Sequence, residues 1–175
     1  MTFQEIINHR RSVRQYKDTP IDAERVKHCL ELASLSPNSP KEKQPKRVKT
    51  WELYYGKVIP ILYSRFFGIL GIIRKILVSI VGMFRPITYQ VSECDVRVVV
   101  HKTCALAAQT FMLAMANEGY DTCPMEGLDS RRIKKILNLP HGAEINMVRS
   151  CGLREERGVW GDRMRVPFED VYKRD

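Results

Sequence analysis

Two groups of arginines, one near each end of the chain, have side-chain chemistry suited to binding a phosphate. The first group is Arg10, Arg11 and Arg14, with the hydroxyl of Ser12 among them. A guanidinium group is a planar fork that matches phosphate oxygens, and a serine adds a short donor. A solvent-exposed basic turn is the alternative interpretation of such a cluster.

The second group is Arg163 and Arg165, which stand two positions apart in the C-terminal part of the chain. In an extended chain, residues at i and i+2 point to the same side, so both guanidinium groups face the same way. A frayed basic tail is the alternative interpretation.

The overall charge agrees with an anionic partner. Among 175 residues, 29 Lys and Arg outnumber 20 Asp and Glu, which gives a net charge of +9. Such an excess favours nucleic acid, an acidic membrane surface or a phosphorylated cofactor as the partner. No zinc-finger spacing or RNA-binding aromatic signature accompanies the charge, so nucleic acid is not expected.

The cysteines and the N-terminal sequence favour a cytoplasmic protein. The five cysteines are odd in number, unevenly spaced and mostly inside apolar runs, with no CxxC pair, which predicts reduced and buried thiols. Residues 1–16 carry charges with no apolar core after them, so no signal peptide is predicted. GxGxxG, GxSxG and HExxH motifs are missing, and His101 has no second ligand at metal spacing, so no metal site is expected.

One strongly apolar helix is expected at the centre of the fold. Residues 103–118 are almost entirely Ala, Leu, Met and Phe, and Gly119 supplies the left-handed residue that ends many helices. Because the helix is apolar nearly all round, it is predicted to be buried on most of its surface. The Pro and Gly residues of Thr122–Gly127 predict a tight loop directly after it.

The whole chain, 1–175, is predicted to form a single domain. Shorter elements are expected before and after the apolar helix. They are a helix capped by Thr2 and ending near His9, a helix from Asp22 to before Ser36, a basic helix capped by Asp129 or Ser130, and a strand over Glu144–Cys151.

Three stretches, in order along the chain, resemble the motifs of the nitroreductase family of FMN enzymes. They are Arg10-Arg11-Ser12-Val13-Arg14 followed by Tyr16, Asp18, Pro20 and Ile21; Ser36-Pro37-Asn38-Ser39-Pro40; and the apolar helix followed by Gly119-Tyr120 and Pro124-Met125-Glu126-Gly127. The resemblance implies an α+β fold, with a small antiparallel-rich sheet flanked by helices and a buried central helix. It also makes Val96–Val100, despite their strand propensity, the first turns of that helix.

The resemblance further implies FMN as cofactor, NAD(P)H as electron donor and a homodimer with the flavin at the subunit interface. The implied reaction is ping-pong hydride transfer through the flavin to a nitroaromatic, a quinone or a similar small-molecule acceptor. Since the cofactor carries the redox step, no catalytic side chain is expected. A flavin-binding protein with weak or no turnover stays open as an alternative.

Carried onto this sequence, the family's flavin contacts fall on residues of both chain ends and of two loops. In the family, the first Arg and the Ser meet the phosphate and ribityl chain, and the next basic position lies beside the flavin pyrimidine. The Ser/Pro/Asn loop approaches the flavin, N–H groups of the Pro-Met-Glu-Gly loop point at its N5 atom, and a late basic pair closes the phosphate site. The implied positions are Arg10, Arg11, Ser12, Arg14, Pro37, Asn38, Ser39, Pro124, Met125, Glu126, Gly127, Arg163 and Arg165.

The chain departs from the family pattern after residue 40. Where the family continues through strands and a helix, Lys41–Lys49 is polar and basic, so an internal segment is predicted to be missing. Pro45 lacks a backbone donor and the charges resist burial, so this stretch is not expected inside a sheet.

Residues 58–86 form the most hydrophobic part of the chain. Phe67–Phe84 comes near the length of a membrane span, but Arg74 and Lys75 lie in its middle, which disfavours a span. Two alternatives stay open. The segment either covers the flavin pocket or a partner subunit, or it lies peripherally on an anionic membrane, at its inner face.

Overall fold

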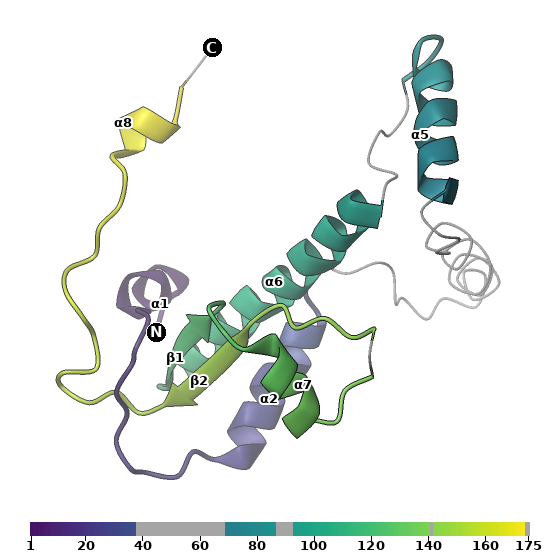
Figure 1. Cartoon of the computed structure of the whole chain (residues 1–175). Coiled ribbons are helices and arrows are strands. Elements are labelled where there is room, and N and C mark those ends of the chain that lie inside the picture. Colours follow the sequence, from purple (N-terminus) through teal and green to yellow (C-terminus); the bar gives the residue numbers. More distant parts are fainter. Residues whose placement is uncertain (38–68, 87–92, 141, 174–175) are drawn as a thin grey trace, which may run out of the picture. The chain divides into compact units, whose positions relative to one another are not determined.

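The computed structural model describes residues 1–37, 69–86, 93–140 and 142–173 (Figure 1). The predictions for Lys41–Lys49 therefore lie outside the described residues. The chain divides into two compact units, Met1–Leu30 together with Met112–Asp175, and Glu31–Phe111. The single domain expected from the sequence stays a prediction.

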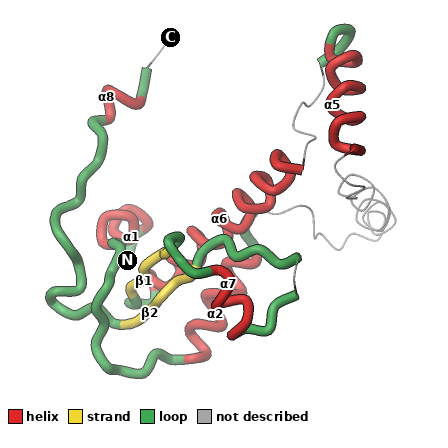
Figure 2. Tube along the Cα trace, in the orientation of Figure 1, coloured by secondary structure: helices red, strands yellow, loops and turns green. Residues whose placement is uncertain are grey.

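The described residues form helices and one small sheet, which confirms the α+β class (Figure 2). In chain order the elements are α1 (Phe3–His9), α2 (Ala23–Ser34), α5 (Ile69–Gly82), α6 (Glu93–Asn117), β1 (Asp121–Met125), α7 (Ser130–Ile136), β2 (Val148–Gly152) and α8 (Phe168–Val171).

Two short helices begin at caps that the sequence predicts. At α1, Thr2 accepts a hydrogen bond from the Glu5 N–H at 3.3 Å, and the Glu5 carboxylate accepts one from the Thr2 N–H at 2.8 Å. This reciprocal capping box satisfies N–H groups that the start of a helix leaves without partners. At α7, Asp129 is the cap, because its side chain accepts from the N–H groups of Arg131 and Arg132.

Helix α6 starts at Glu93 and includes Val96–Val100, as the family resemblance implied for the first turns of the central helix. The helical state of these valines confirms that their strand propensity is overridden by context. After the helix ends, Gly119 adopts a φ of 83°, which a glycine reaches without steric cost. The Tyr120 N–H then donates to the Met115 carbonyl at 2.8 Å, and the chain turns into β1.

Within one chain, α6 is buried mainly along its last turns. Phe111, Met112 and Ala116 are buried, and Met115 has 0% exposure. Nearer the N-terminal end of the helix, Leu106 is 48% exposed. The buried central helix predicted from the sequence is therefore found in the turns that lead into β1.

Among the described residues, Arg97–Asn117 is the one helical stretch with the length and hydropathy of a membrane span. A helix in the core of a protein has the same two properties. Because Met115 and Ala116 are packed inside the protein, we assign the end of this stretch to the core.

The tight loop predicted for Thr122–Gly127 is wrong for its first part. Asp121–Met125 form strand β1, which pairs antiparallel with β2 in a register that places Thr122 opposite Cys151. Pro124 is tolerated because a strand of a two-stranded sheet keeps one edge that requires no donor. Strand β2 starts at Val148 rather than at the predicted Glu144.

The N-terminal segment joins this sheet and carries the first arginine group with it. Ser12 forms a parallel bridge with Thr122, and Tyr16 forms an antiparallel bridge with Arg154, just after β2. Between them, the Val13 N–H donates to the Thr122 carbonyl at 3.2 Å, and the Val13 side chain is fully buried. Burial of Val13 therefore anchors the arginines on both sides of it.

Candidate functional site

The two ends of the chain meet at a pocket of about 220 Å³, which we call the arginine pocket. Every arginine that the sequence predicts for the site lines it, so the structure brings both basic groups together. The lining residues are Arg10, Arg11, Ser12, Arg14, Trp160, Asp162, Arg163, Met164 and Arg165.

A close backbone crossing brings the two basic groups together. The Arg14 N–H donates to the Gly158 carbonyl at 2.8 Å. Gly158 is required at this crossing, because a Cβ there would lie 2.6 Å from the Gln15 carbonyl oxygen. The crossing thus fixes the chain just before Trp160, where the C-terminal wall of the pocket begins.

The arginine pocket is strongly positive. Burial lowers the pKa of Arg10, and the charges of Arg163, Arg165 and Arg11 lower it further. A guanidinium pKa that is lowered by like charges means that the cations repel one another. Among the described residues that line the pocket, Asp162 supplies the one carboxylate. An added anion would therefore relieve the remaining repulsion.

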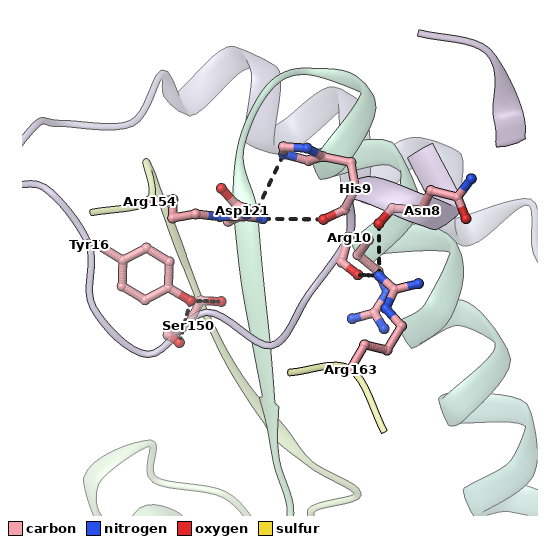
Figure 3. A network of polar contacts seen from close by, with 8 residues as sticks. All are labelled: Asn8, His9, Arg10, Tyr16, Asp121, Ser150, Arg154 and Arg163. Carbon is pink, nitrogen blue, oxygen red and sulfur yellow. Dashed lines mark hydrogen bonds and ion pairs between the residues drawn. The ribbon is translucent and has the colours of Figure 1, made fainter. Parts of the chain in front are cut away.

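Arg163 has a structural role in addition to its place in the pocket. Its Nη2 donates to the carbonyls of Asn8 and Arg10, both at 2.8 Å, at the end of α1 (Figure 3). The last carbonyls of a helix have no partner within the helix, and a nearby cation is stabilising. Arg163 therefore fastens α1 to the C-terminal segment, a role that the sequence did not predict.

Trp160 belongs to the site although it was not predicted. The Arg14 guanidinium lies over the indole ring, 4.7 Å from its centroid, which is a cation–π contact. One residue further on, the Gly161 carbonyl accepts a hydrogen bond from Arg11 Nη2 at 2.9 Å. The turn Gly158–Gly161 thus orients two arginines. A tryptophan next to a glycine, three residues before a basic pair, is the sequence signal that could have found it.

A second pocket, of about 480 Å³, shares Arg14 with the arginine pocket, and we call it the β1 pocket. It includes the whole predicted Pro-Met-Glu-Gly stretch, which forms the end of β1 and the turn after it. The lining residues are Arg14, Cys123, Pro124, Met125, Glu126, Gly127 and Ser150. Cys123 and Ser150 were not predicted; both lie on the paired strands that the sequence interpretation treated as a loop and as a longer strand.

A network of polar contacts joins the end of α1, β1 and the chain around β2 (Figure 3). Asp121, which is buried at the start of β1, accepts a hydrogen bond from Arg154 Nη2 at 2.5 Å. The same Arg154 nitrogen lies 3.3 Å from the His9 carbonyl, to which it donates, and the His9 ring lies 4.0 Å from Asp121 Oδ1. The Tyr16 hydroxyl lies 2.9 Å from Ser150 Oγ, on the wall of the β1 pocket. These contacts tie the end of α1 to the start of β1 and to Arg154, and they tie Tyr16 to β2.

The predicted Ser/Pro/Asn contribution stays a prediction. Pro37 is exposed and belongs to the compact unit Glu31–Phe111, whereas the residues that line both pockets belong to the other unit. Asn38 and Ser39 lie outside the described residues, so their assignment stays a prediction. Within the part of the chain that the structure describes, no group of three His, Cys, Asp or Glu side chains is placed to hold a metal ion.

Comparison with protein families identifies the family to which the chain belongs. The model of the nitroreductase family matches residues 7–51 and 77–153, more than half of the chain. The chain belongs to the nitroreductase family. The matched residues include the first arginine group, α6 and both strands, whereas residues 52–76 and the late arginine pair lie outside the match.

Individual relatives match shorter stretches. MhqN of Bacillus subtilis is 39% identical over 51 residues, which are 29% of this chain and 25% of MhqN. DrgA of Synechocystis sp. is 32% identical over 66 residues, which are 38% of this chain and 31% of DrgA. The matches thus span about a quarter to a third of the length of these curated relatives.

A solved structure supports the fold over nearly the whole chain. It is a variant of NfnB from Sphigopyxis sp. strain HMH, described as an FMN and NADPH-dependent nitroreductase. The TM-score is 0.59 at 17% identity, and the alignment covers 99% of this chain and 98% of NfnB. At this identity the likeness establishes the fold.

Proposed function

We propose that this chain binds FMN and is an oxidoreductase that passes hydride from NAD(P)H to a nitroaromatic, a quinone or a similar small molecule. The observation that supports it is the convergence of five arginines on one pocket that shares Arg14 with a second pocket. An anion site beside a site of partly apolar lining matches the outline of a phosphorylated flavin. The family assignment and the FMN and NADPH dependence described for NfnB favour the same cofactor and donor.

In this proposal the arginine pocket holds the phosphate. Arg10 and Arg165 offer guanidinium forks, and Ser12 offers a hydroxyl. Arg163 already donates to the carbonyls at the end of α1, so its contribution to the phosphate is partly that of a fixed positive charge. A dianionic phosphate among these groups would reduce the repulsion that lowers the pKa of Arg10.

The β1 pocket holds the ring system of the flavin in the same proposal. Pro124 and Met125 give the ring an apolar wall, and Glu126 and Gly127 bring backbone N–H groups to it. When bound, FMN would supply the redox chemistry by accepting hydride and passing it on. Arg14, at the wall shared by both pockets, would stabilise the negative charge that the reduced ring acquires.

Flavin titration of the full chain tests the assignment of the two pockets. Riboflavin lacks the phosphate, so the protein should bind FMN more tightly than riboflavin. Arg10→Ala should weaken FMN binding roughly 10- to 100-fold, since a hydrogen bond to a charged group contributes about 1.5–3 kcal/mol. Riboflavin binding should change little. Arg131→Ala, on an exposed position of α7, is the matched control and should change neither.

Two results would change the proposal in different ways. Equal affinity for FMN and riboflavin would contradict the phosphate assignment. If FMN binds but NADPH neither bleaches it without an acceptor nor is oxidised when a quinone is added, the chain is a flavin-binding protein without turnover instead of an oxidoreductase.

We also propose that α6 meets a second copy of the chain in a homodimer. Leu106 is 48% exposed, and Val98–Val100 are exposed on the same helix, which leaves apolar surface for a partner to cover. Leu106→Glu should give monomers by light scattering. Ala108 is a poorer position for this test, because it is buried within the chain and its substitution would disturb folding. A wild-type chain that is monomeric with FMN bound would refute the dimer.

A further inference from the structure

Helix α5 presents several large apolar side chains to solvent between Ile72 and Ile80. Ile72, Ile73, Ile76, Leu77 and Ile80 are all exposed, Ile76 to 55%. At 3.6 residues per turn these five positions fall on one arc of about 140°. Met83 and Phe84 follow the helix directly and are exposed as well. The result is one continuous apolar stripe, which we call the α5 stripe.

The charges of this segment have a single sign. Residues 69–86 contain Arg74, Lys75 and Arg85 and no Asp or Glu. Lys75 and Arg85 are exposed. By the same helical geometry, Lys75 lies outside the arc of the α5 stripe. A cationic flank beside an apolar stripe is the pattern of helices that lie in the headgroup region of anionic membranes.

The length of α5 decides between spanning the membrane and lying on it. Its 14 residues extend about 21 Å, which is shorter than the roughly 30 Å of a bilayer's hydrocarbon core. The helix therefore fits along the membrane surface.

The same charges disfavour a second copy of the chain as the occupant of the stripe. If α5 packed on the same helix of a second copy around a two-fold axis, Lys75 and Arg85 would add positive charge on both sides of the contact. No acidic residue of the segment is available to balance them. An anionic lipid surface supplies the opposite charge.

We propose that α5 docks the protein on anionic membranes, with the α5 stripe at the boundary of headgroups and acyl chains and Lys75 and Arg85 toward lipid phosphates. This inference does not depend on flavin binding, because it rests on the side chains and charges of α5 and the residues directly after it.

Vesicle co-sedimentation of the full chain tests the proposal. The protein should bind vesicles that contain phosphatidylglycerol, bind phosphatidylcholine vesicles much less, and lose binding as salt is added. Ile76→Gln should weaken binding at least about tenfold, because it removes a large apolar side chain that the membrane would bury. Val78→Gln, on the opposite side of the same helix, is the matched control and should change binding less than about twofold.

A separate variant tests the cationic flank of the α5 stripe. Lys75→Gln should weaken binding to anionic vesicles about fivefold and leave the weak binding to neutral vesicles unchanged. Equal binding to both vesicle types, or no binding to either, would overturn the proposal. So would an equal effect of Ile76→Gln and Val78→Gln. If Ile76→Gln dissociates a dimer in solution while vesicle binding is undetectable in the wild type, the stripe faces a second copy instead.

Discussion

The last turns of α6 and helix α5 are both rich in apolar residues, yet the first are largely buried and the described isoleucines of α5 are exposed. Met115 in α6 has 0% exposure, whereas Ile76 in α5 has 55%. The two helices differ in charge, because residues 103–117 contain no charged side chain and α5 has Arg74 and Lys75 in its middle. An apolar composition thus predicts that the surface of a helix is buried against another surface. The charges within the helix indicate whether that surface is the core of the same chain.

The comparison predicts a large difference in stability between equivalent truncations. Met115→Ala should lower the free energy of unfolding by about 2–5 kcal/mol, because it leaves a cavity in a packed core. Ile76→Ala should lower it by less than about 0.5 kcal/mol, since the side chain is largely in solvent already. Urea unfolding of both variants measures the difference. Similar losses would mean that the α5 stripe is covered in the free protein.

The ion pair between Asp121 and Arg154 extends the comparison of buried and exposed groups to charged side chains. Asp121→Asn keeps the size of the side chain but leaves Arg154 without its carboxylate, and should cost about 1–3 kcal/mol. The expected loss is below that of a fully buried pair because Arg154 is 26% exposed. The control is Asp22→Asn, which alters an exposed pair with Arg25 at 3.7 Å and should cost less than about 1 kcal/mol. Equal losses in denaturant unfolding would contradict a structural role for Asp121.

Trp160 is exposed, as Ile76 is, but its ring has a contact within the chain, the guanidinium group of Arg14. Its contact with Arg14 is in a 64% exposed position, so Trp160→Leu should weaken FMN binding only about two- to fivefold. Trp160→Phe keeps an aromatic face and should lose less. Flavin titration measures the FMN affinity of both variants. Equal losses of affinity would mean that the cation–π contact is not the cause of the loss.

The smallest effect is expected at alkaline pH. Burial raises the pKa of Tyr16 above its ordinary 10.0, against the opposing effect of its hydrogen bond to Ser150. The stability that this shift contributes is fully present below pH 10 and is lost as the pH rises through the folded-state pKa. Tyr16→Phe should therefore show a shallower loss of stability above pH 10 than the wild type. Tyr172→Phe, at an exposed position, is the control and should retain the wild-type slope.

The features that the sequence predicted are those that depend on local spacing. Thr2 and Asp129 are caps because their side chains reach the next turn of the same helix. Arg10 and Arg165 could be assigned to one site because the residue type alone marks an affinity for anions, and the family resemblance supplied the pairing.

The features that were missed depend on partners far away in the sequence. Pro124 and Gly127 favour a loop locally, and β1 exists because β2 and Ser12 supply its pairing. No local pattern places the Arg163 guanidinium on the carbonyls of α1 or Arg14 over Trp160, since both contacts arise where the two chain ends cross.

Arg163 links two events that would otherwise be independent. It lines the arginine pocket and also fastens the C-terminal segment to the end of α1. Peeling that segment away would open the pocket and release the helix end in a single step. Escape of a tightly held phosphate and local unfolding of the chain end would then share one rate. The rate at which a protease cleaves the C-terminal segment would therefore report the rate at which the ligand leaves.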